Sequence, residues 1–165
     1  MANASAVGRS AQGPIPVLAM SPFYGWLPRS LWRKVKDFFV YSSDFIPLAA
    51  GGTATQDIAV QADSDFVIIA GVRVYTTTGD VAIAGDFFPA LVTIRDSGSG
   101  RQLMDRPVHA QNLFGTAQLP AYWPFPKLIR ASSTVSTTLQ NLEATARNIR
   151  ISYWGFKVFP VLAEE

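Results

Sequence analysis

Apolar and polar residues alternate along most of the chain between residues 39 and 159. Because successive side chains of a strand point to opposite faces, this period of two predicts β-strands. Clusters of Gly, Pro, Ser, Asn and Asp separate the alternating runs and predict turns. The predicted strands span residues 39–47, 58–60, 66–75, 81–83, 90–96, 101–104, 127–131, 134–139 and 147–159.

The longest apolar run, Phe66 to Tyr75, is the centre of this pattern. A regular period of two puts one set of its side chains on a single face: Phe66, Ile68, Ala70, Val72 and Val74. The opposite face is also apolar near its start, so this strand is predicted to be central in a sheet. The acidic turn 62–65 joins it to the strand 58–60, either as a hairpin or as a corner of a sandwich.

Many short strands with turns about every ten residues predict an all-β fold, an antiparallel β-sandwich of which the jelly roll is one form. A chain of 165 residues suits one such domain, assigned here to residues 39–165. Residues 1–38 are predicted to be an extended N-terminal arm that ends in a short helix, 30–38. Pro28 precedes this helix, Ser30 can cap it, and Leu31, Val35 and Phe38 recur at helical spacing.

The arm has two parts of different composition. Residues 1–13 are small and polar, which is typical of a disordered segment or of an extended arm that becomes ordered only on a partner. Residues 14–28 contain four prolines together with Phe23, Tyr24 and Trp26, and are too apolar to remain in water. These aromatic residues either cover an edge of the chain's own core or dock on a neighbouring subunit, and the sequence leaves both options open.

A second segment rich in proline and aromatic residues, 107–126, has no strand period. Long loops in compact domains are commonly functional or packed against other structure. We therefore predict that this loop contacts a partner, with the alternative that it closes the open end of the sandwich. Its aromatic candidates for partner binding are Phe114, Tyr122, Trp123 and Phe125.

Charged residues are few: they make up 16% of the chain, compared with 48% for apolar residues. The first 36 residues carry five cations and no acid, among them Arg33 and Lys34. This density is too low for a segment that binds nucleic acid, so nucleic acid is an unlikely partner. Arg33 and Lys34 are instead candidates for ion pairs with acidic surfaces of a protein partner.

The sequence offers little catalytic chemistry. It has no cysteine and a single histidine, His109, so no thiolate or histidine metal set can form. Asp63 and Asp65 could bind Ca²⁺ in the acidic turn, but aspartate is also a common turn residue. We therefore expect no enzyme activity, no cofactor and no required metal. No run approaches the roughly 18 apolar residues of a membrane span, which predicts a soluble protein made in the cytoplasm.

Four strings resemble small structural proteins encoded among the head genes of tailed bacteriophages: DFIPLAAGGTATQDIAVQADSDFVI, ALVTIRDSGSGRQLMDRPV, NLFGT and NIRISYWGFKVF. The shared features are a QxDSDF turn, a DxGSGRxL hairpin and a closing I-x-I-x-x-x-G-x-K strand, within residues 44–159. The resemblance implies a β-sandwich component of the virion that partners the major capsid protein or other virion proteins. It implies a minor capsid or capsid-decorating subunit, and leaves a collar, tail or fibre-base role open. The aromatic residues of the loop 107–126 separately predict a homo-oligomeric or particle-bound subunit. Independently of the resemblance, exposed Tyr122 and Trp123 could also stack on sugars in a carbohydrate-binding sandwich.

Overall fold

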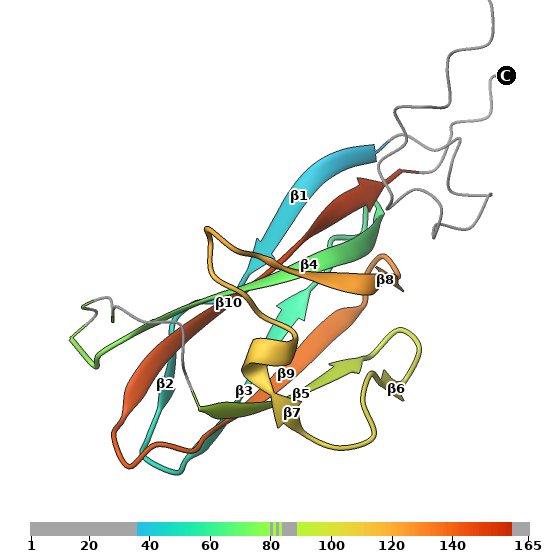
Figure 1. The fold of residues 1–165 in the computed structure, drawn as a ribbon. Coiled ribbons are helices and arrows are strands. Elements are labelled where there is room, and N and C mark those ends of the chain that lie inside the picture. The colour runs from blue at the N-terminus through green and yellow to red at the C-terminus, as the bar shows by residue number, and fades with distance from the viewer. Residues whose placement is uncertain (1–35, 80, 82, 84–88, 160–165) are drawn as a thin grey trace, which may run out of the picture.

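The computed structural model describes residues 36–79, 81, 83 and 89–159. These residues form ten strands and one short 3-10 helix, arranged as two antiparallel sheets packed face to face (Figure 1). The elements are β1 (Lys36–Ser42), β2 (Ile46–Leu48), β3 (Thr53–Ala59), β4 (Asp65–Thr76), β5 (Ala90–Asp96), β6 (Arg101–Gln102), β7 (Val108–His109), η4 (Ala110–Asn112), β8 (Ala121–Ile129), β9 (Thr134–Asn141) and β10 (Arg147–Val158). The predicted all-β sandwich is confirmed.

The first sheet, called sheet A, has the order β1-β10-β4-β8, with β2 also paired to β10. The second, sheet B, has the order β3-β9-β5-β6, with β7 also paired to β5. β4 lies between β10 and β8, which confirms the predicted central position of its apolar run. Because β3 and β4 belong to different sheets, the acidic turn between them is a corner of the sandwich and not a hairpin.

The core fills the space between the inward faces of the two sheets. As predicted, alternate residues of the last strand share one face, and Ile149, Ile151 and Tyr153 are fully buried there. The Tyr153 hydroxyl lies 2.6 Å from the Thr137 hydroxyl of β9 and so links sheet A to sheet B. Burial raises the pKa of Tyr153, which therefore stays protonated and neutral in the core.

A β-bulge corrects the predicted faces of the central strand. Trp154 lies opposite Ala70 and Gly155 lies opposite Ile68, so Ile69 is an extra residue on β4. The strand changes face at this point, because an inserted residue reverses the alternation that follows it. Phe66 and Ile68 pack in the core with Tyr75, whereas Ala70 packs with Val67 and Ile69 on the other side. The prediction that Ala70, Val72 and Val74 share the face of Phe66 and Ile68 is therefore wrong.

Three further predictions are refined at the level of single elements. The predicted helix 30–38 fails at its end, because Lys36 to Phe38 lie in β1 and pair with Phe156 to Val158 of β10. Residues 30–35 lie outside the described residues.

The predicted strand 81–83 is not found. Val81 and Ile83 are described but are not part of a strand, and the Val81 carbonyl instead accepts a hydrogen bond from the Thr77 backbone N–H in a turn. The hairpin across 97–100 is confirmed as the β5–β6 pair, shortened to two residue pairs.

Candidate assembly surfaces

The second half of the predicted loop 107–126 is the edge strand β8, which is a correction to the sequence analysis. Among the described strands, β8 pairs only with β4, so Pro124 and Pro126 remove no hydrogen bond that a second described neighbour would need. Ile68 of β4 pairs with Lys127 of β8, but Ala70, two residues later on β4, pairs with Tyr122, five residues earlier on β8. Residues 123–126 therefore bulge away from β4. The aperiodic pattern of this segment reflects the bulge and its prolines, which conceal the strand in the sequence.

Two of the four aromatic residues predicted to contact a partner lie inside the chain's own fold. Phe114 is 0% exposed and its ring lies 5.5 Å from that of Tyr153. Trp123 is 8% exposed, its ring lies 6.0 Å from Tyr153, and its indole N–H donates to the Leu113 carbonyl over 3.0 Å. Both side chains close one end of the core and pack against Tyr153. The alternative interpretation, in which this segment closes the sandwich, holds for these two residues.

The other two aromatic candidates are exposed on β8. Tyr122 is 54% exposed and Phe125 is 67% exposed. Phe125 borders an apolar cavity of about 270 Å³, which is lined by Ile94, Leu103, Met104, Leu113, Trp123, Pro124, Phe125 and Lys127. The cavity lies where the β8 edge of sheet A faces the β5–β6 hairpin of sheet B. We call this region, which includes the exposed ring of Phe125, the open side.

An ion pair joins the two sheets across the open side. Lys127 of β8 extends its ammonium to 3.3 Å from the Asp96 carboxylate of β5. Burial alone would raise the pKa of Asp96, but hydrogen bonds from Ser99 and Lys127 outweigh it and hold the pKa below the ordinary value of 3.8. Ser99 and the Gly98 N–H donate to the same carboxylate over 2.6 Å and 3.0 Å. The cavity therefore has a fixed charged wall beside otherwise apolar walls.

The outward surface of sheet A carries a second apolar region, which we call the outer face. The strand registers place apolar side chains in two rows that cross all four strands. One row holds Val40, Trp154, Ala70 and Tyr122, and the next holds Phe38, Phe156, Val67 and Leu128. The Phe38 ring meets the rings of Trp154 and Phe156 edge-on at 6.1 Å and 6.2 Å. The sequence signal was present, because the last strand is apolar or aromatic on both of its faces near its end.

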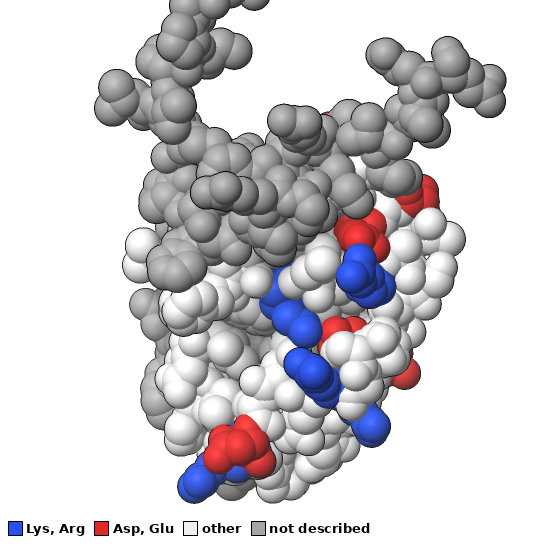
Figure 2. Space-filling model, turned by 90° about the vertical axis from the view of Figure 1, so that its right-hand side faces the viewer, with Lys and Arg blue, Asp and Glu red and all other residues white. Residues whose placement is uncertain are grey.

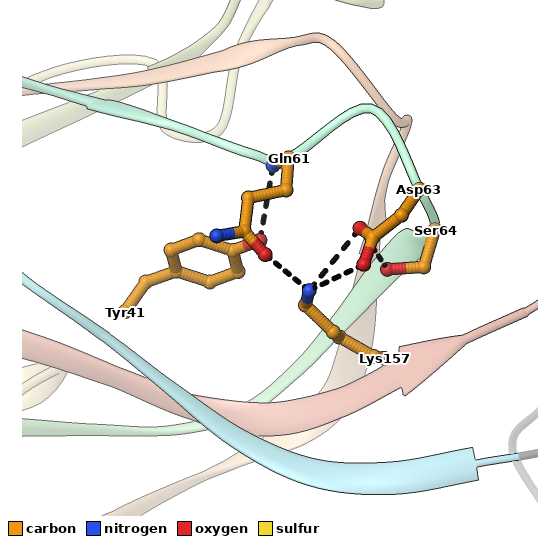
Figure 3. Close-up of polar contacts among 5 residues, drawn as sticks. All are labelled: Tyr41, Gln61, Asp63, Ser64 and Lys157. Atoms are coloured by element: carbon orange, nitrogen blue, oxygen red, sulfur yellow. Dashed lines mark hydrogen bonds and ion pairs between the residues drawn. The ribbon is translucent and has the colours of Figure 1, made fainter.

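The sandwich corner between β3 and β4 is held by Lys157, a residue that sequence reasoning did not single out. Its ammonium donates to Gln61 and to both oxygens of Asp63, the latter over 2.9 Å and 3.1 Å (Figure 3). It also lies 4.6 Å from the centre of the Phe39 ring. Tyr41 completes the corner by accepting the Gln61 backbone N–H over 3.0 Å. The sequence does contain an indication of this role: Lys157 follows Tyr153 at an even spacing on the same strand, so it is expected on the inward face.

Both aspartates of the acidic turn have protein partners that account for them. Asp63 is paired with Lys157, and Asp65 accepts hydrogen bonds from Arg130 and from the Ala131 backbone N–H. Their carboxylates thus hold the corner to β10 and to the end of β8. Among the described residues, no group of three or more His, Asp and Glu side chains gathers where a metal ion could be held.

The corner predicts a specific acid sensitivity. The hydrogen bond from Lys157 lowers the pKa of Asp63 below its ordinary value of 3.8, so the unfolded chain binds this proton more tightly. The ion pair therefore stabilises the fold above that value, and its contribution is lost as the pH falls through the lowered pKa. We expect Asp63→Asn to flatten this acid limb in urea melts recorded between neutral and acid pH.

Lys157→Met should remove the same component, and the double variant should show strong non-additivity because the two residues form one contact. An acid limb that is unchanged in Asp63→Asn would show that this pair does not contribute to it.

The remaining predicted residues fall elsewhere. Phe23, Tyr24, Trp26, Arg33 and Lys34 lie outside the described residues. His109 is exposed in β7. On the side that Figure 2 views, Lys and Arg residues lie beside Asp and Glu residues instead of forming a continuous basic surface over the described part. No helix in the described part of the chain is long and apolar enough to cross a membrane.

Comparisons with known proteins add little to this geometry. No family model matches the chain, and no curated protein matches it either. Among solved structures, the chain is similar to the crystal structure of an infectious bursal disease virus VP2 subviral particle, with 13% identity and a TM-score of 0.28. The match covers 76% of this chain and 42% of that chain. A similarity at this level assigns neither a family nor a function.

Proposed function

We propose that this protein is a non-enzymatic structural subunit of a virus particle, a minor capsid or capsid-decorating protein that assembles through its open side. The observation that carries the proposal is the exposure of Phe125 beside an apolar cavity at the edge of the sandwich. An exposed aromatic ring next to an unfilled apolar cavity is typical of a protein contact. The resemblance to phage head proteins supplies the viral setting.

The strand pairing supports a jelly roll, an architecture found in viral capsid and lectin domains. If β1 and β2 count as one strand and β6 and β7 as another, the described residues form eight strands. The first pairs with the last (β1 with β10), the second with the seventh (β3 with β9), the third with the sixth (β4 with β8) and the fourth with the fifth (β5 with β6). This is the pattern of one long hairpin wound around itself. Because fold alone does not fix function, the winding supports the proposal without carrying it.

The chemistry of the open side suits a partner surface with apolar side chains. Leu103 and Met104 form a deformable apolar wall, and methionine fills irregular gaps well. The Lys127 and Asp96 pair borders the cavity and already satisfies its own charges. The partner is a second copy of the chain or the major capsid protein. Residues 1–13, Arg33 and Lys34 remain predicted contacts to other virion proteins, and a collar, tail or fibre-base position would use the same surface.

A carbohydrate-binding role has less support. Sugar stacking on this sandwich would use the neighbouring rings of Tyr122 and Trp123 as one platform. Trp123 is buried against Tyr153, with its indole N–H bonded to the Leu113 carbonyl, so its ring faces the core. Without Trp123 beside it, Tyr122 does not form the predicted two-ring platform.

The proposal predicts that Phe125→Ser weakens self-association of the purified protein without lowering its melting temperature. Loss of an interface aromatic commonly costs 2 kcal/mol or more, which corresponds to a dissociation constant raised about 30-fold. Sedimentation velocity over a concentration series measures this shift. The matched control is Leu142→Ser, which removes a side chain of 45% exposure in the loop that joins β9 and β10. Equal association of wild type, Phe125→Ser and Leu142→Ser would contradict a contact between two copies of the chain at the open side.

A further inference from the structure

The outward surfaces of the two sheets differ sharply in polarity. On sheet B, the registers align polar rows across β3, β9 and β5, such as Thr55, Thr138 and Thr93, or Asp57, Ser136 and Arg95. The hydroxyls of Thr55 and Thr138 lie 2.8 Å apart. Such a face is typical of an antiparallel sheet that borders water. The outer face of sheet A has two apolar rows in the corresponding place, so it needs a covering layer.

Burial within the outer face points to cover supplied by the chain itself. Its centre is buried in the single chain, since Val67 is 1% exposed and Ala70 is 0% exposed; Val158, beside the rows at the end of β10, is 2% exposed. These side chains point away from sheet B, which packs on the opposite side of sheet A. The margins are open by comparison, with Phe38 at 58% exposure on β1 and Tyr122 at 54% on β8.

We propose that residues 14–28 of the same chain lie across the outer face of sheet A and form a third layer. This segment is the apolar part of the sequence upstream of β1, and Phe23, Tyr24 and Trp26 supply rings that match the rows of Phe38, Trp154 and Phe156. Its four prolines suit a segment that covers a face by side-chain packing, because such a segment needs no ladder of backbone N–H bonds.

The position of β1 makes this arrangement accessible within one chain. β1 begins at Lys36, which pairs with Val158 beside the apolar rows. The eight residues from Pro28 to Lys36 can span at most about 26 to 29 Å. The four strands of sheet A measure about 14 Å across at the usual strand spacing. A short tether also gives the segment a high effective concentration at its own outer face, which favours it over a copy from another molecule.

Photo-crosslinking of the full-length protein tests the proposal. p-Benzoylphenylalanine is incorporated in place of Tyr24, and in a second protein in place of Trp26. Light and nitrogen-15 labelled preparations are mixed before irradiation, and crosslinked peptides are identified by mass spectrometry. We expect crosslinks to β4 and β10 that join light to light and heavy to heavy chains only. The same photoreactive residue placed at Ala6 should give no crosslink to these strands.

Two outcomes would overturn the proposal. Mixed light–heavy crosslinks would place the segment on a second copy, and crosslinks confined to sheet B or absent altogether would remove it from the outer face. Trp154→Ser should reduce the yield at Tyr24 several-fold, whereas Thr93→Ser on the polar face of sheet B should leave it unchanged. The inference concerns a different surface from the open side, so its failure leaves the Phe125→Ser experiment unaffected.

Discussion

Replacing Trp123 with alanine is expected to lower the free energy of unfolding by about 3 to 5 kcal/mol. The indole ring is 8% exposed and packs edge-on against Tyr153 at the end of the core. Its removal opens a hole beside a residue that is itself fully buried, and it leaves the Leu113 carbonyl without the indole N–H donor. Urea melts of the full-length protein followed by circular dichroism measure the loss.

Tyr122→Ala is the matched control, because it removes the neighbouring ring on the same strand, which is 54% exposed and points to the opposite face. We expect a much smaller loss of stability for this variant. A Trp123→Ala protein that melts like the wild type but no longer associates would instead place the ring in a subunit contact, against its burial in the core.

Replacing Gly155 with alanine is expected to destabilise the fold. A Cβ at this position would lie 2.0 Å from the Val67 carbonyl oxygen and 2.8 Å from the Phe66 ring. The nearest atom belongs to the backbone of the adjacent strand, so the bulge between β4 and β10 must open to admit a methyl group. Overpacking of this kind typically costs about 1 to 3 kcal/mol and occasionally more. Thermal melts would detect the change directly.

Gly79→Ala provides the comparison, since a Cβ there meets only the Thr77 hydroxyl at 3.8 Å. This variant should melt within a small margin of the wild type. If Gly155→Ala were equally neutral, the close approach of β10 to β4 at the bulge would be wrong.

Local pattern predicts those parts of this fold that depend on one strand at a time. The alternation of Ile149, Ile151 and Tyr153 identifies an inward face, and the glycine and serine loop 97–100 identifies a hairpin. Between Phe66 and Ile69 the side chains on both faces of the strand are apolar, and this correctly indicates a central strand. These features follow from side-chain periodicity and turn chemistry, which are properties of the sequence itself.

Features that depend on two strands at once were not predictable in this way. The bulge at Ile69 arises because β4 has one more residue than β10 between the pairs Ala70–Trp154 and Ile68–Gly155. The change of face after the bulge therefore depends on how the two strands pair, and the sequence of β4 alone does not indicate it. Residues 121–126 of β8 are predicted as loop, whereas 127–129 fall in a predicted strand. The prolines of the first part are acceptable only on an edge, and edge position is a property of the whole sheet. In the same way, residues 36–38 fit a helical pattern when considered alone, but they form the start of β1 because they pair with β10.

The candidate site shows the same division. The sequence identified an aromatic cluster in residues 114–125, but could not say which rings face the core. The close approach of Leu113 and Phe114 to Gly71, where a Cβ would lie 2.2 Å from the Leu113 carbonyl oxygen, directs Phe114 inward. The bulge of residues 123–126 then leaves Phe125 on the surface. Lys157 was missed because its partners, Gln61 and Asp63, are distant in sequence.

The mass of the native complex that contains this chain, isolated from its natural source without denaturation, tests the proposed structural role most directly. The account predicts a particle many times heavier than the 17.9 kDa chain, in which the chain occurs in a fixed ratio to other virion proteins. Recovery of the chain as a free 17.9 kDa monomer, with no associated virion protein, would contradict it.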